Sequence, residues 1–174
     1  MTLLTPDQLF PMAGRHQRLL GLDMGSKTIG LALSDVSRTI ASPLQTLQRT
    51  KFTKDVNILF QLIDKHDVAG LVIGYPVSLD GSEGPACQSV RQFANNLLGL
   101  RDIPLALWDE RLSTAAVTRT LLEADASRRQ RAQVVDKMAA AYILQGALDF
   151  MGRSGLKALA CNDQELPNRQ KAKE

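Results

Sequence analysis

Two hydrophobic patterns alternate along this chain of 174 residues. Short apolar runs bounded by Gly, Pro, Asn or Asp are typical of buried strands, whereas apolar residues three and four positions apart are typical of amphipathic helices. The predicted strands are residues 18–24, 27–34, 39–47, 69–73 and 103–108. The predicted helices are residues 53–66, 86–99, 113–124 and 131–151.

The order of these elements predicts the fold class. The first three strands form a meander, with a tight turn at Gly25-Ser26, and strands and helices alternate afterwards. This order predicts an α/β fold with a mixed five-stranded sheet flanked by helices. Pro43 lacks an amide hydrogen, so its strand is expected at an edge of the sheet.

The same patterns predict one folded domain with two appendages. Residues 18–151 form this domain, and residues 1–17 form an N-terminal appendage. Gly152 is expected to end the last helix, and residues 152–174 then form a flexible, polar C-terminal tail.

Composition narrows the class of protein only a little. The net charge is +3 and the pI is about 9.0, which is compatible with a nucleic-acid partner but does not require one. Cys87 and Cys161 lie far apart, so they predict neither a zinc site nor a disulfide framework. The chain has no signal-peptide pattern and no apolar run of membrane-spanning length, so we expect a cytoplasmic protein.

Three carboxylates occupy positions where a packed α/β domain would not place them without a reason. Asp23 follows the apolar run of the first strand, and Glu110 follows the apolar run of the last one. Asp136 shares a helix face with Ala139, Ala140 and other apolar residues at spacings of three and four. A buried carboxylate is costly unless a cation or hydrogen bonds compensate it.

Each of these carboxylates also has a structural explanation. Asp23 could simply begin a turn, Glu110 could open an exposed connection, and Asp136 could favour the dipole at the start of its helix. Taken together, the three instead suggest a shared divalent cation, because carboxylate oxygens are hard ligands suited to Mg²⁺ or Mn²⁺. Two such ions can activate water and stabilise the leaving oxygen of a phosphodiester.

Four motifs resemble those of the YqgF-type family of pre-16S rRNA nucleases, bacterial relatives of the RuvC Holliday junction resolvases with an RNase H-like fold. The first motif is Leu22-Asp23-Met24-Gly25-Ser26-Lys27-Thr28-Ile29-Gly30 and continues to Asp35. The second runs from Gly74 to Pro85. The third is Asp109-Glu110-Arg111-Leu112-Ser113-Thr114, and the fourth begins at Asp136-Lys137.

The resemblance spans about residues 18–150 and keeps the four motifs in the order of the family. It implies a nuclease that matures the end of small-subunit ribosomal RNA, with Asp23, Glu110 and Asp136 as catalytic metal ligands for Mg²⁺ or Mn²⁺, expected as two ions. Thr28 departs from the family pattern, which often has Arg there, as do Tyr75 and Ser78. These departures concern substrate contacts and leave the three carboxylates intact.

Several cations lie in or near the motif segments and could guide phosphates past the carboxylates. The candidate nucleic-acid-binding residues are Lys27, Arg91, Arg111, Arg128, Arg129, Arg131 and Lys137. A solvated loop is the alternative for the arginines at 128–131. Aromatic residues make up only 5% of the chain, so recognition of the backbone and of shape is expected rather than base readout.

The leading hypothesis is a metal-dependent nuclease acting on structured RNA, as a monomer or a homodimer. The alternatives are a Holliday junction resolvase acting on four-way DNA and a non-enzymatic RNA-binding or transcription-associated module. An actin-like ATPase also uses a DxG turn, but that fold needs two subdomains and a much longer chain.

Overall fold

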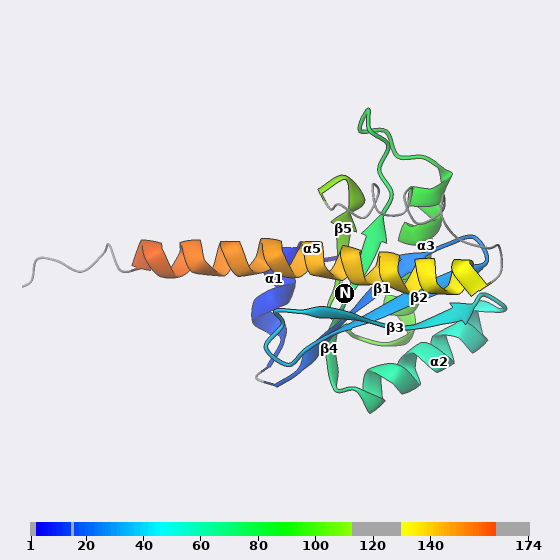
Figure 1. The fold of residues 1–174 in the computed structure, drawn as a ribbon, viewed down its shortest axis with the longest axis horizontal. Helices are drawn as coiled ribbons and strands as arrows, with labels where there is room; N and C mark the ends of the chain where they lie inside the picture. The colour runs from blue at the N-terminus through cyan, green and yellow to red at the C-terminus, as the bar shows by residue number, and fades with distance from the viewer. Residues whose placement is uncertain (1–2, 15, 113–129, 163–174) are drawn as a thin grey trace, which may run out of the picture.

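A five-stranded mixed sheet forms the centre of the molecule (Figure 1). The computed structural model describes residues 3–14, 16–112 and 130–162. The strands lie in the order β3-β2-β1-β4-β5. Their bounds are Arg18–Met24 for β1, Thr28–Ser34 for β2, Ala41–Gln48 for β3, Val68–Tyr75 for β4 and Leu105–Asp109 for β5.

The sheet combines an antiparallel meander with parallel strands, as the sequence predicts. Strand β2 pairs antiparallel with both β1 and β3, whereas β4 pairs parallel with both β1 and β5. The carboxyl ends of β1, β4 and β5 therefore meet at one edge of the sheet. Open α/β sheets bind their ligands at this kind of edge.

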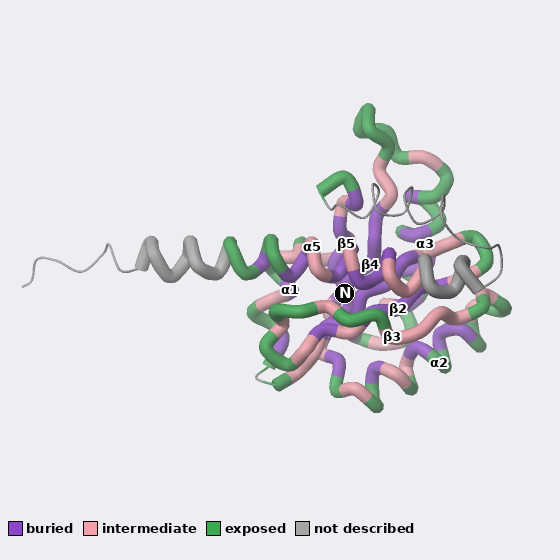
Figure 2. Tube along the Cα trace, viewed as in Figure 1, coloured by how far each residue is buried: buried purple, intermediate pink, exposed green. Residues whose placement is uncertain are grey.

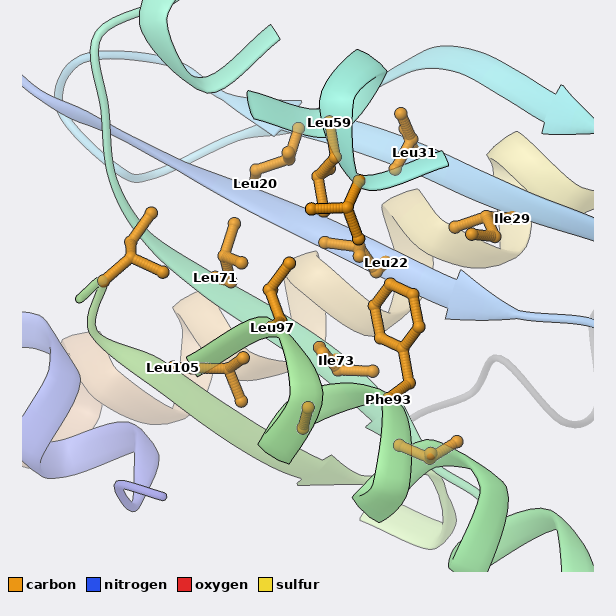
Figure 3. Close-up of a cluster of buried hydrophobic side chains, with 14 of the residues drawn as sticks. Leu20, Leu22, Ile29, Leu31, Leu59, Leu71, Ile73, Phe93, Leu97 and Leu105 are labelled. Atoms are coloured by element: carbon orange, nitrogen blue, oxygen red, sulfur yellow. The ribbon is translucent and has the colours of Figure 1, made fainter. Parts of the chain in front are cut away.

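Two helices cover one face of the sheet with large apolar side chains. Helix α2 spans Phe52–Lys65 and α3 spans Pro85–Leu100. Figure 3 shows side chains from both helices meeting strand residues in one cluster. Residues of the cluster that the figure labels are Leu20, Leu22, Ile29, Leu31, Leu59, Leu71, Ile73, Phe93, Leu97 and Leu105.

Helix α5, Gln130–Asn162, covers the opposite face and lies much closer to the strands. A Cβ added to Gly21 of β1 would lie 2.7 Å from Leu144 Cβ. A Cβ added to Gly30 of β2 would lie 2.1 Å from the carbonyl oxygen of Asp136. Glycine inside a strand often marks such a close approach of another backbone, and here it brings the start of α5 onto β2.

The segment before β1 packs against the same face as α5. It contains the short helix α1, Pro6–Leu9, and the 3₁₀ turn η1, Phe10–Met12. Leu9 is fully buried over Gly70, and Leu4 pairs in parallel with Ala106 of the edge strand β5. The division of the chain into appendage, domain and tail stays a prediction, but the described part of the appendage contributes to the core.

The last helix is longer than the sequence pattern predicts. It continues through Gly152 and ends at Asn162. Glycine commonly ends a helix by taking a positive φ, and Gly152 does not take one. The predicted helix at 113–124 lies outside the described residues. Figure 2 shows that burial is concentrated in the sheet, while the connection at residues 78–83 is exposed. Within the described ranges, no helix combines the length and apolar character needed to span a membrane.

Candidate functional site

Asp23 lies at the carboxyl end of the central strand β1 and is only 7% exposed. Side chains alternate between the faces of a strand, so Asp23 lies on the same face as Leu19 and Gly21, the face that α5 covers. Its partner in the antiparallel register is Gly30 of β2. The first predicted carboxylate is therefore buried beneath the helix that carries the third one.

Glu110 begins the 3₁₀ turn η2, Glu110–Leu112, directly after β5. Its side chain is 9% exposed and reaches over β4. A Cβ added to Gly74 would lie 2.5 Å from Glu110 Oε1 and 2.6 Å from Ile143 Cδ1 of α5. The register of β1 and β4 pairs Leu22 with Ile73, so Gly74 is the next residue along from this pair and lies beside Asp23. The missing side chain at position 74 thus opens the space that the Glu110 carboxylate occupies.

Asp136 lies in the first part of α5, where this helix crosses β2. Thr28 Oγ1 donates a hydrogen bond of 2.5 Å to Asp136 Oδ2. The main chain of Asp136 contacts Gly30, the residue opposite Asp23. Asp136 is partly buried, in agreement with its predicted place on the apolar face of the helix.

All three predicted carboxylates therefore belong to one face and one edge of the sheet. They do not form a ready three-ligand cluster: within the described part of the chain, no three His, Cys, Asp or Glu side chains are grouped closely enough to hold a metal ion. The assignment of Asp23, Glu110 and Asp136 as metal ligands stays a prediction. Thr28 is the contact that sequence reasoning missed, because its partner lies 108 positions away in the chain.

Two of the predicted phosphate-binding arginines are engaged by neighbouring acids. Arg111 donates hydrogen bonds to both carboxylate oxygens of Asp109, the shorter of them 2.6 Å. These hydrogen bonds lower the pKa of Asp109. Arg91 forms an ion pair of 2.9 Å with Glu83 and a hydrogen bond of 2.6 Å with the Tyr75 hydroxyl.

The contacts of Arg91 fix the connection between β4 and α3. Tyr75 ends β4 on the α2 and α3 side of the sheet, and burial raises the pKa of its hydroxyl against the opposing effect of Arg91. The guanidinium group also lies 5.5 Å from the centre of the Tyr75 ring. Arg91 therefore positions the second motif, in addition to any contact with a ligand.

The other predicted cations divide into two groups. Lys27 is exposed in the turn between β1 and β2, and Lys137 is partly exposed next to Asp136. Arg128 and Arg129 lie outside the described residues. Arg131 lies within α5, but the structure describes only its backbone. All these nucleic-acid assignments stay predictions.

Arg49 is a cation near the site that the motifs do not include. It follows β3, and its guanidinium donates a hydrogen bond of 2.7 Å to the carbonyl oxygen of Gly25. Its backbone N–H donates to the carbonyl oxygen of Lys27 at 2.9 Å. Arg49 thereby holds the turn that follows Asp23. Its distance from the first motif in the sequence hid this role.

Comparison with known proteins places these features in a family. A family model described as RuvX, Holliday junction resolvase, matches residues 17–150. A protein of Paramagnetospirillum magneticum named "Putative pre-16S rRNA nuclease" is 68% identical over 155 residues, which cover 89% of this chain and 99% of that protein. A protein of the same name from Rhodospirillum rubrum is 62% identical over 136 residues, covering 78% of this chain and 84% of that protein.

The fold is also similar to that of a solved RuvC structure. The structure of Thermus thermophilus RuvC in complex with a Holliday junction substrate aligns with a TM-score of 0.51 and 12% sequence identity. The alignment covers 80% of this chain and 97% of that chain. The likeness confirms the predicted RNase H-like fold.

Proposed function

Because the chain belongs to the RuvX family, we propose that it is a metal-dependent nuclease that hydrolyses phosphodiester bonds in structured RNA. We further propose that its substrate is the ribosomal RNA precursor whose maturation gives the end of 16S rRNA. A relative that carries the name of such a nuclease matches this chain over 99% of its own length. The one structural observation that carries the proposal is the placement of Asp23, Glu110 and Asp136 on the same face of the sheet.

The donor set suits a hard divalent cation. Three carboxylates offer six oxygens, and Mg²⁺ and Mn²⁺ prefer such ligands. The space over Gly74, which a Cβ would fill, supports the fit because the Glu110 carboxylate lies in it beside β1. We propose that Asp23, Glu110 and Asp136 hold the cation, with two ions as the expected number. When bound, such cations activate water and stabilise a leaving oxygen.

The residues of the chain supply position and charge. Asp23 and Glu110 are buried on a rigid sheet edge, which fixes the direction of their carboxylates. The hydrogen bond from Thr28 fixes one oxygen of Asp136, and a carboxylate held in this way can still offer its other oxygen to a cation. The Thr28 hydroxyl and the close contact of the Asp136 backbone with Gly30 therefore both position the start of α5.

Cleavage and metal binding test this proposal together. The purified protein is incubated with ribosomal RNA precursor and, separately, with four-way junction DNA, in Mn²⁺ or in EDTA. We expect Mn²⁺-dependent cleavage of the RNA, and we expect Asp23→Asn to abolish it. The matched control is Asp102→Asn, an identical change at an exposed aspartate in the connection before β5.

Thermal unfolding gives a second readout. At a Mn²⁺ concentration of about 100 Kd, binding adds about 2.7 kcal/mol, or roughly 5–10 °C in Tm for a chain of this length. We expect Asp23→Asn to lose this response and Asp102→Asn to keep it. Unchanged RNA cleavage by Asp23→Asn would contradict the proposed site. A melting temperature of the unchanged protein that does not respond to Mn²⁺ would also contradict it.

A Holliday junction resolvase is the second candidate function, favoured by the description of the family model that matches this chain. Cleavage of the four-way DNA with no cleavage of the RNA precursor would support it. Binding of RNA without cleavage of either substrate would instead support a non-enzymatic module.

A further inference from the structure

Paired and unpaired cations are unevenly distributed over the described surface. Arg91, Arg101 and Arg111 each form an ion pair with a nearby carboxylate. Several other described cations show no ion pair, and four of them lie close together near the β1–β2 turn and the start of α2. These four are Lys27, Arg49, Lys51 and Lys54, which we call the basic strip.

The basic strip is continuous in space. The backbone hydrogen bond from Arg49 to Lys27 joins the end of β3 to the turn between β1 and β2. Lys51 precedes α2 directly, and the backbone N–H of Lys54 donates to the carbonyl oxygen of Lys51 at 2.9 Å. The strip therefore runs from the β1–β2 turn to the first turn of α2, on the same side of the molecule in Figure 1.

Little negative charge opposes the strip. Asp55 is the acidic residue of the first turn of α2, and it is only 6% exposed. Its carboxylate accepts hydrogen bonds from the backbone N–H and the hydroxyl of Thr50, at 3.1 and 2.8 Å. Arg49 donates to a neutral carbonyl oxygen, so its charge is not compensated there. The acidic residue beside the strip in the chain is therefore buried and hydrogen-bonded, whereas the three lysines of the strip are exposed.

The strip begins beside the candidate site. The turn that carries Lys27 follows Asp23 after one strand residue, Met24, and Thr28 at its end holds Asp136. On the other side of the site, the charges of Arg91 and Arg111 are balanced by Glu83 and Asp109. The basic strip therefore lies on the α2 side of the carboxylates, and none of its cations forms an ion pair among the described residues.

We propose that the basic strip binds backbone phosphates of the nucleic-acid strand that extends from the carboxylate site toward α2. This proposal rests on the proposed function and adds the direction in which the substrate leaves the site. Flexible lysines contact phosphates as point charges and without reading sequence. The strip fits a substrate recognised by its backbone and shape.

Binding measured without cleavage tests the strip. The anisotropy of a fluorescently labelled RNA hairpin with a single-stranded extension is recorded in EDTA at a series of salt concentrations. The test variants are Lys54→Gln and the double variant Lys51→Gln/Lys54→Gln. The matched control is Lys65→Gln, because Lys65 is also exposed and lies at the opposite end of the same helix.

Each lost phosphate contact should lower the slope of log K against log salt by about 0.7 for a single strand. Between 1 M and 0.1 M salt, each phosphate contact therefore strengthens binding about fivefold. A variant that loses one contact should have about a fivefold higher Kd at 0.1 M salt. We therefore expect the double variant to bind the RNA more than tenfold more weakly and Lys65→Gln to bind like the unchanged protein.

The outcomes separate the strip from the nuclease. Equal Kd values and salt slopes for the double variant and the unchanged protein would overturn the strip, even if the protein cleaves RNA with Mn²⁺. If the double variant lost binding to vesicles of anionic lipid but bound RNA like the unchanged protein, the proposed role of the strip would likewise be overturned in favour of membrane binding. Weakened RNA binding in a protein that cleaves no nucleic acid would uphold the strip and contradict the proposed function.

Discussion

The two faces of the sheet are built in opposite ways. On the face covered by α2 and α3, the strands present large side chains such as Leu22, Leu31 and Ile73. On the face covered by α5, the residues next to these in sequence include Gly21, Gly30 and Gly74. Strand alternation keeps the two sets apart, so β1, β2 and β4 carry large side chains on one face and a glycine on the other at these positions.

This difference separates stability from chemistry. Large interlocking side chains fill the α2 and α3 face and supply much of the hydrophobic stabilisation. The bare face lets the backbone of α5 contact β2 and leaves space for the Glu110 carboxylate over β4. The candidate site therefore depends on residues that have no side chain at all.

The largest effect should come from Gly30→Ala. The new Cβ would lie 2.1 Å from the carbonyl oxygen of Asp136 and 2.5 Å from its carbonyl carbon, and neither backbone atom can move alone. Overpacking of this kind costs about 1–3 kcal/mol and occasionally more, and we expect the upper part of that range. The shift of α5 should also move Asp136 away from Thr28. Urea unfolding measures the loss of stability.

Gly99→Ala is the matched control for this substitution. Gly99 lies in α3 on the other side of the sheet, and a Cβ there would meet no atom within 4 Å. Alanine is the better helix former, so this variant should gain about 0.5–1 kcal/mol. An unfolding midpoint for Gly30→Ala equal to that of the unchanged protein would show that α5 does not need this bare strand.

Gly74→Ala should affect activity more than stability. Its Cβ would lie 2.5 Å from Glu110 Oε1 and 2.6 Å from Ile143 Cδ1, which are both ends of flexible side chains. These groups can rotate away, so we expect a stability loss at the low end of the overpacking range, about 1 kcal/mol. The displaced carboxylate should then weaken Mn²⁺ binding.

A titration of Mn²⁺ followed by thermal unfolding measures this effect. We expect Gly74→Ala to need at least tenfold more Mn²⁺ than the unchanged protein for the same rise in Tm. Gly99→Ala again serves as the control and should keep the original response. Unaltered Mn²⁺ affinity in Gly74→Ala would separate Glu110 from the metal site.

The sequence indicated the acidic residues of the α5 face better than it indicated how α5 packs on the strands. Asp23 and Glu110 followed apolar strands, and helical periodicity placed Asp136 on an inward face, so their burial could be anticipated. The glycines inside β1 and β2 were a usable indication of close approach that local patterns left unassigned. The contact between Gly30 and Asp136 joins distant parts of the chain, and no periodicity specifies which strand a helix will cross.

Local patterns do not show which groups a charged side chain will contact or where a long helix will end. Arg111 and Arg91 stay predicted phosphate-binding groups, but the sequence did not indicate that the carboxylates of Asp109 and Glu83 would pair with them. Gly152 is a typical helix terminator, yet α5 continues past it to Asn162. Both features depend on the folded surroundings of a residue rather than on its type.

The smallest predicted effect is a pH dependence of the contacts that hold α5. Gln145 of α5 donates to the carbonyl oxygen of Thr39 and accepts from the backbone N–H of Ala41, which ties α5 to the connection between β2 and β3. Asp35 organises this connection by accepting hydrogen bonds from Ile40, Ser37 and Thr39, and they lower its pKa to about 2.

Because the pKa of Asp35 is lower in the folded chain than its ordinary value of 3.8, the ionised form stabilises the fold above about pH 4. This stabilisation is lost as the pH falls from about 4 to about 2. The connection is partly exposed to solvent, so its contribution should stay below about 1 kcal/mol, or about 2–4 °C in Tm.

Thermal unfolding of Asp35→Asn between pH 5 and pH 2 checks this prediction, since the amide cannot ionise. The variant should melt below the unchanged protein at pH 5, and the difference should vanish as Asp35 becomes protonated. Asp64→Asn is the comparison on α2. The hydrogen bond from Arg101 also lowers the pKa of Asp64, but this ion pair is exposed and screened, so the pH-dependent difference should be smaller than for Asp35→Asn. A constant difference between Asp35→Asn and the unchanged protein across this pH range would mean that the shape of the side chain, and not its charge, holds the connection to α5.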